Sequence, residues 1–85
     1  MASRYDGIAR HLAQQPGPTY TAAFRVVAQA TGHPRLRNAA YTRPLWWTND
    51  PAHPQARHGW LAAGWQVETV DLARQVVTFR RSRSV

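Results

Sequence analysis

All four tryptophans of this 85-residue chain lie in one window, between Leu45 and Trp65. Tryptophan is the largest side chain and buries about 150–250 Å² when it packs in a core. A chain of this length buries only a little over about 60% of its unfolded surface, so its core is small. We therefore expect the core to be anchored in this window, within a single domain that spans residues 1–85.

The chain is strongly basic, because eleven arginines face only four acidic residues and there is no lysine. A GC-rich genome would explain arginine in place of lysine, but not the shortage of aspartate and glutamate. Basic proteins attract polyanions, and neutralising phosphates releases counterions from nucleic acid. The planar guanidinium also binds two phosphate oxygens at once. The net charge of +7 thus favours DNA as a partner, with double-stranded DNA preferred.

The residue types that catalysis and metal binding require are sparse. There is no cysteine, so disulfides and cysteine-based zinc sites are excluded. The histidines are too scattered for a metal site, and the acids are too few and too scattered for a two-metal nuclease. We therefore expect neither enzymatic activity nor a cofactor. These residues are His11, His33, His53 and His58, and Asp6, Asp50, Glu68 and Asp71.

The hydropathy pattern bears on location. No run of the sequence approaches the ~18 apolar residues of a membrane span, and the N-terminus lacks the apolar core of a signal peptide. We expect a protein of the cytoplasm of a bacterium or its phage, with no membrane partner. Binding to DNA would place it at the nucleoid.

The opening segment has the pattern of an amphipathic helix. Tyr5, Ile8 and Leu12 follow at spacings of three and four, which put them on one helix face. Ser3 is a suitable residue to cap the start of this helix. The proline- and glycine-rich stretch at 14–18 is expected to end it.

A second helix is expected after that turn. It would open at Thr19 or Thr21, bury an apolar stripe that starts at Phe24, and end at Gly32. The pattern of residues 33–42 is ambiguous. Its small apolar residues could make one helical turn, from which the neighbouring arginines would project outward.

Residues 43–48 look like a short strand, and Pro44 places its start at a sheet edge. On a strand, Trp46 and Trp47 would face opposite sides. One of them should belong to the core. The other would be either a second core face or an exposed platform on which a base stacks.

The turn signal at 49–51 predicts a third helix that runs to about Ala63. Gly64 is then expected to adopt the left-handed conformation that ends many helices. Alternating side chains predict a hairpin, with strands at 65–70 and 75–80. The basic residues at 81–85 would form a flexible tail.

These elements predict an α+β domain of winged-helix-like build. It would contain three helices and a small antiparallel sheet, made from the short strand 43–48 and the C-terminal hairpin 65–80. A three-helix domain with a two-stranded wing fits the order of the elements nearly as well. The two predictions differ in whether residues 43–48 join the sheet.

The sequence also resembles a family of small bacterial domains of unknown function. The resemblance rests on a tandem tryptophan before an asparagine, a helix exit rich in tryptophan, and a final hairpin ending in Phe-Arg-Arg. In this chain they are Trp46-Trp47-Thr48-Asn49, Trp60-Leu61-Ala62-Ala63-Gly64-Trp65 and Phe79-Arg80-Arg81. Similar domains occur alone or attached to restriction and defence proteins, which implies a role in nucleic-acid traffic but no established activity.

The chain departs from this family in the segment before the tryptophans. Arg37 stands where family members usually have proline, and Ala39-Ala40-Tyr41 stands where they have a Ser-Ala-Arg run. If the family's arginine contacts a partner, Arg37 or Arg43 would have to make that contact here.

We expect the DNA contacts to come from three groups of residues. Arginines around the ambiguous segment would hold phosphates, the exposed face of the third helix would read a groove, and the hairpin arginines would grip the backbone as a basic wing. Asn49 could read adenine with two hydrogen bonds, or simply bond to the backbone of its own turn. The full set is Arg35, Arg37, Arg43, Trp47, Asn49, Gln55, Arg57, His58, Arg74, Arg80, Arg81 and Arg83.

Two other functions stay open from the residues alone. A protein-interaction or inhibitory accessory module of a phage, toxin or defence system would use the exposed tryptophan face, with an acidic protein as its partner. A binder of RNA or single-stranded DNA would stack bases on the same tryptophan. A homodimer would suit a small regulator, although no residue pattern fixes one.

Overall fold

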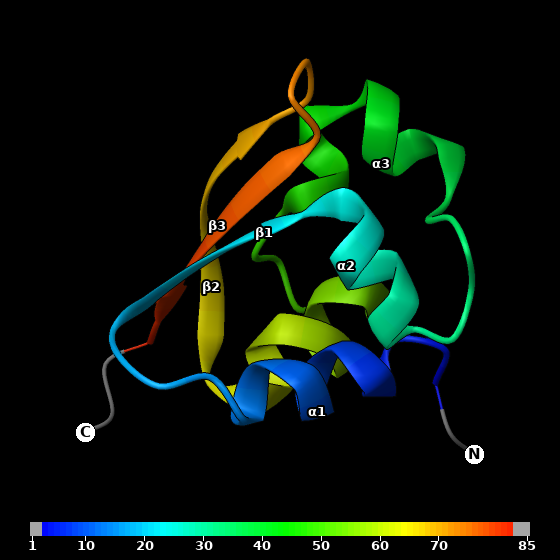
Figure 1. Ribbon diagram of the computed structural model, residues 1–85. Coiled ribbons are helices and arrows are strands. Elements are labelled where there is room, and N and C mark those ends of the chain that lie inside the picture. Colours follow the sequence, from blue (N-terminus) through cyan, green and yellow to red (C-terminus); the bar gives the residue numbers. More distant parts are fainter. Residues whose placement is uncertain (1–2, 83–85) are drawn as a thin grey trace.

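The computed structural model describes residues 3–82, which fold into an α+β domain with a three-stranded antiparallel sheet. In Figure 1 the strands lie on one side and the helical segments pack beside them. With η marking short helical turns of other types, the elements are α1 (Asp6–Ala13), β1 (Thr19–Ala23), α2 (Phe24–Ala30), α3 (Asn38–Thr42), η1 (Pro44–Trp47), η2 (Ala56–Trp60), η3 (Leu61–Ala63), β2 (Trp65–Asp71) and β3 (Val76–Arg81).

The sheet has one face on the core and one on solvent. The strand order is β1-β3-β2, so β3 is central. Ala22 on β1 lies opposite Val77 on β3, and both side chains are buried. The adjacent pair Thr21 and Thr78 shares a hydroxyl hydrogen bond of 2.9 Å on the solvent face. The predicted C-terminal hairpin is confirmed as β2 and β3.

The prediction of a helix opening at Thr19 or Thr21 is wrong. Thr19–Ala23 forms strand β1, and α2 begins only at Phe24. Threonine and tyrosine alternate in this stretch, and β-branched and aromatic residues favour a strand over a helix. The Phe24 amide donates to the Gln75 carbonyl at 2.8 Å, so the hairpin turn fixes where the strand ends and α2 starts.

The predicted strand at 43–48 is also wrong. Pro44–Trp47 forms the 3-10 turn η1, and the third strand of the sheet is β1 instead. Proline at a first helical position is favourable, because the N–H that it lacks would have no partner there. Trp47 donates from Nε1 to the Ala40 carbonyl at 2.9 Å, which fastens η1 to α3. With α3 included, residues 3–82 hold more helical segments than the three predicted.

A row of stacked aromatic rings forms the centre of the core. Phe24 stacks on Trp47 with ring centroids 4.7 Å apart, and Trp47 stacks on Trp60 at 5.7 Å. Trp60 then meets Phe79 of β3 at 5.9 Å. Trp60 and Trp65 are fully buried, as predicted. The tryptophan window therefore joins α2, η1, η2 and the sheet into one core.

The third predicted helix is present but irregular. It runs through η2 and η3, and the backbone leaves helical geometry at Gly59 (φ −94°, ψ −106°). Gly59 is buried against the side chain of Ile8, so η2 packs on α1. Gly64 ends the segment in the left-handed conformation with φ 80°, as predicted.

The apolar face of the first helix follows its prediction, with Tyr5, Ile8 and Leu12 all buried. The expected Ser3 cap does not, because α1 begins at Asp6 and the Ser3 hydroxyl accepts from the Tyr5 amide before the helix starts. It touches α2 at backbone level, because a Cβ on Gly7 would overlap the carbonyl oxygen of Ala30. Within residues 3–82, no helix has the length and apolar character needed to cross a membrane.

Candidate nucleic-acid interface

Three of the predicted arginines gather around α3. Arg37 immediately precedes the helix, and Arg43 immediately follows it. The Arg35 guanidinium lies 3.9 Å from the centroid of the Tyr41 ring, which draws Arg35 onto the same helix by a cation–π contact. All three arginines are exposed. A helix of five residues is thus bordered by three cations.

The orientation of α3 is set by its buried side. Leu36 and Ala40 are buried, and the Leu36 amide donates to the Tyr41 hydroxyl at 3.1 Å. The opposite side of the helix presents Asn38 and Thr42, which are both exposed. We name the surface formed by Arg35, Arg37, Asn38, Thr42 and Arg43 the α3 face.

The α3 face has no carboxylate nearby in the sequence. Residues 7–49 contain neither aspartate nor glutamate. Among residues 3–82, the only salt bridge joins Arg74 and Asp71, at 4.0 Å. The arginines of the α3 face therefore have no acidic partner within those residues. Their positive charge is therefore available to an anionic ligand.

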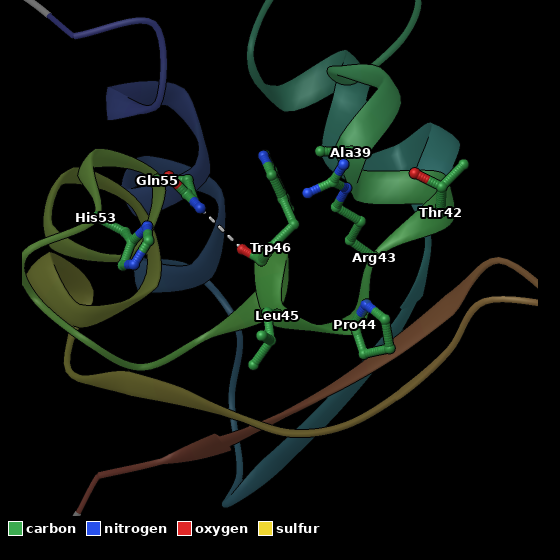
Figure 2. A pocket seen from close by; sticks show the side chains of 8 residues that line it. All are labelled: Ala39, Thr42, Arg43, Pro44, Leu45, Trp46, His53 and Gln55. Atoms are coloured by element: carbon green, nitrogen blue, oxygen red, sulfur yellow. Dashed lines mark hydrogen bonds between the residues drawn. The ribbon is translucent and has the colours of Figure 1, made fainter.

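A pocket of about 520 Å³ adjoins the α3 face. Figure 2 shows that it is built from the end of α3, the turn η1 and the segment at residues 53–55. Leu45 is 81% exposed and Trp46 is half-buried. The lining residues are Ala39, Thr42, Arg43, Pro44, Leu45, Trp46, His53 and Gln55.

Three of the predicted contact residues have structural roles instead. Trp47 is buried in the aromatic row, so the prediction of an exposed Trp47 platform is wrong. Gln55 is not on an exposed helix face, because it is buried and donates to the Trp46 carbonyl at 2.9 Å. Asn49 accepts from the Val67 amide at 2.8 Å and donates to the Val67 carbonyl at 3.0 Å, so its amide holds the edge of β2.

The other two residues predicted on the third helix lie away from the α3 face. Arg57 is exposed and His58 is half-buried, both within η2. In Figure 1, η2 lies beside α1 at the end of the molecule opposite α3. The structure therefore does not bring Arg57 or His58 together with Arg35, Arg37 and Arg43.

The hairpin arginines are split between the two ends of the sheet. Arg74 lies in the β2–β3 turn, which is at the same end of the molecule as α3 in Figure 1, and it is paired with Asp71. Arg80 and Arg81 lie at the far end of β3. Arg83 lies outside the described residues.

Arg81 is part of the fold rather than of a flexible tail. It is the last residue of β3, and its side chain donates to the carbonyls of Gly17 at 3.1 Å and Gln15 at 2.7 Å. Its guanidinium lies 4.5 Å from the centroid of Trp65. Arg81 therefore does not belong to the tail expected at 81–85, and residues 83–85 lie outside the described part of the chain.

Prediction from the sequence missed Asn38, Thr42, Leu45 and His53 as site residues, and it left open whether Trp46 or Trp47 would be exposed. The helical turn considered for residues 33–42 would have placed Asn38 and Thr42 beside the arginines. No sequence signal indicated the pocket, because it depends on η1 bringing residues near 45 next to residues near 53.

The fold and the α3 face together define a small basic α+β domain with one arginine-bordered surface. The chain belongs to the family described as Domain of unknown function (DUF7662), whose model matches residues 7–82. The resemblance to a family of small domains of unknown function is thereby confirmed. No curated protein and no solved structure matched the chain.

Proposed function

We propose that this domain binds double-stranded DNA without catalysis, as a winged-helix-like module that docks through the α3 face. The observation that carries the proposal is the set of three exposed arginines that border α3, in a stretch from residue 7 to residue 49 that holds no acidic residue. Arginine at such a surface neutralises phosphates and releases counterions.

The order of the elements and the sheet support the winged-helix assignment. A helix, a strand and two helices come first, the turns η1, η2 and η3 follow, and a hairpin ends the order. The sheet order is β1-β3-β2 with antiparallel neighbours. In a winged-helix domain the second and third helices form the helix-turn-helix unit and the hairpin is the wing. Here α2 and α3 would form that unit. The β2–β3 turn with Arg74 would be the wing.

In this proposal the helix that contacts base edges in the major groove is α3, and not the segment at 56–63. That segment buries Ala56, Gly59 and Trp60 against the core, and Gln55 before it is buried too. On α3, by contrast, Asn38 and Thr42 point away from the core between Arg37 and Arg43. Asparagine can bond to adenine N6 and N7 in the major groove, and arginine to guanine O6 and N7.

The length of α3 limits how much sequence it reads. Five residues rise about 8 Å at ~1.5 Å per residue, which spans about two base-pair steps of ~3.4 Å. Phosphate contacts would therefore supply most of the affinity, and base contacts a narrow preference. If the α3 face and Arg74 neutralise about four phosphates, the slope of log affinity against log salt is roughly −4.

Fluorescence-anisotropy titration of a random-sequence duplex at several salt concentrations tests the proposal. Arg37→Ala and Arg43→Ala are each expected to weaken binding and to make the slope shallower by about 1. Arg57→Ala removes the same charge from η2, outside the α3 face, and is the matched control, with a slope close to the parent's.

Two results would contradict the proposal. One is absence of duplex binding at about 50 mM salt, where the phosphate contribution to affinity is large. The other is an Arg57→Ala variant that weakens as much as Arg43→Ala, since binding would then follow net charge and not the α3 face.

The protein-interaction module with an acidic partner is the second candidate. The exposed Leu45 beside the pocket favours it. However, Leu45 is the only exposed large hydrophobic residue among residues 3–82. A docking surface for a protein normally needs an apolar patch of several hundred Å², which one side chain does not supply. The DNA proposal uses the whole α3 face and is therefore preferred.

A further inference from the structure

The pocket beside the α3 face combines apolar walls with a cationic rim. Pro44, Leu45 and Trp46 supply apolar and aromatic surface, while Arg43 and His53 supply polar atoms at the rim. Its volume of about 520 Å³ falls within the range of roughly 300–1,000 Å³ typical of small-molecule sites. A ligand that fits this chemistry has a flat apolar part and a negative charge.

Trp46 is held in one orientation by its surroundings. Its ring makes edge-to-face contacts with Trp47 at 4.8 Å, and with Tyr5 and Trp60 at 6.1 Å each. The Gln55 side chain fixes its carbonyl, as the dashed line in Figure 2 shows. Trp47 and Trp60 are buried, whereas Trp46 is half-buried and lines the pocket. The indole therefore offers a preorganised surface on which a planar ring stacks.

Leu45 is exposed over 81% of its surface and stands on the same rigid turn. Pro44 before it restricts the backbone, and Trp46 after it is packed on the core. DNA-binding proteins insert leucine and other apolar side chains between base pairs, where they take the place of lost stacking. Along the chain, Leu45 follows Arg43 of the α3 face by two residues and directly precedes Trp46.

We infer that this pocket receives one nucleotide whose base has been unstacked from the duplex bound on the α3 face. Trp46 stacks on the extruded base, Arg43 holds an adjacent phosphate, and Leu45 fills the gap left in the duplex. This inference rests on the proposed DNA binding. Charge favours a nucleotide over an apolar peptide, because Arg43 is at the rim and no carboxylate lines the pocket.

Competition between paired and mismatched duplexes tests the inference. Extruding a base costs least where the base is already mispaired. The parent protein is therefore expected to bind a duplex with one central mismatch about tenfold tighter than the fully paired duplex of the same length. Anisotropy at a single salt concentration measures both affinities, so their ratio is independent of the general phosphate contribution.

Two variants locate the effect in the pocket. Leu45→Ala changes an exposed side chain, so the variant folds. Trp46→Leu keeps an apolar side chain but removes the aromatic surface. Both are expected to bring the ratio close to one while paired-duplex binding stays within about threefold of the parent. His33→Ala is the control for a substitution outside the pocket, because His33 is exposed and does not line it. This variant keeps the tenfold ratio.

The outcomes separate the two proposals. A parent protein that binds paired duplex but shows a ratio of one overturns base extrusion and leaves DNA binding in place. A parent protein that binds neither duplex overturns both. A Leu45→Ala variant that keeps the full ratio overturns the role of Leu45 even if Trp46→Leu fails to fold.

Discussion

Arg80 and Arg81 are adjacent arginines with the same charge, and the structure predicts that only one of them stabilises the fold. Arg81 donates to two main-chain carbonyls in the 15–17 loop and covers the ring of Trp65. Arg80 is exposed on the same strand. Substituting each by alanine removes one positive charge from nearly the same place, so the pair isolates the effect of the Arg81 contacts.

The expected magnitude follows from those contacts. Each side chain to carbonyl hydrogen bond contributes about 0.5–1.5 kcal/mol to stability. A cation–π contact at an exposed position adds about 0.5–1 kcal/mol. We therefore expect Arg81→Ala to lower the free energy of unfolding by about 2 kcal/mol. Arg80→Ala should change it by less than about 0.5 kcal/mol, as is usual for surface substitutions.

Urea unfolding, followed by tryptophan fluorescence, measures the difference. With a slope of about 1–2 kcal/mol per M for a small domain, Arg81→Ala lowers the midpoint by about 1–2 M, and Arg80→Ala leaves it near the parent value. Arg81→Lys keeps the charge but not the planar fork that reaches both carbonyls, so it restores only part of the loss. Equal midpoints for the two alanine variants would refute the structural role of Arg81.

Two further predictions concern packing and pH. Gly7→Ala places a Cβ against the carbonyl of Ala30, so α1 and α2 must separate. The unfolding free energy is expected to fall by about 1–3 kcal/mol in a urea titration, and an unchanged midpoint would contradict the close contact. Burial raises the pKa of the Tyr20 hydroxyl, which is hydrogen-bonded to His11 at 2.7 Å. Because the raised pKa belongs to the folded state, this contribution to stability is complete below pH ~10 and is lost as pH rises above it. Tyr20→Phe should abolish that part of the alkaline decline in urea midpoint, and an unchanged decline would contradict it.

The sequence was a good guide wherever the hydrophobic pattern and a turn signal agreed. The first helix, the hairpin and the left-handed Gly64 were predicted on that basis and are confirmed. The burial of Trp60 and Trp65 followed from their size alone. These features depend on local spacing and on side-chain volume, both of which can be read from the chain.

The failures occurred where tertiary pairing chose between two local possibilities. Threonine is a suitable helix cap as well as a strand residue, and only pairing with β3 makes Thr19–Ala23 a strand. Arg35, Arg37 and Arg43 could be grouped from the sequence because they share one segment, but the contacts of Arg81 could not be predicted. The fold places Arg35, Arg37 and Arg43 around α3. Arg81 lies at the end of β3, where its side chain donates to main-chain carbonyls.

The 3-10 turn at Pro44–Trp47 shows how one local choice determines both core and site. With three residues per turn, consecutive side chains lie about 120° apart, whereas on a strand they would lie on opposite faces. Trp46 and Trp47 can therefore touch each other at 4.8 Å, with Trp47 in the aromatic row and Trp46 at the wall of the pocket. Because the Trp47 indole also bonds to Ala40, the core that holds η1 holds α3 in place as well. The arginine-bordered helix and the pocket are thus positioned by the same buried tryptophan.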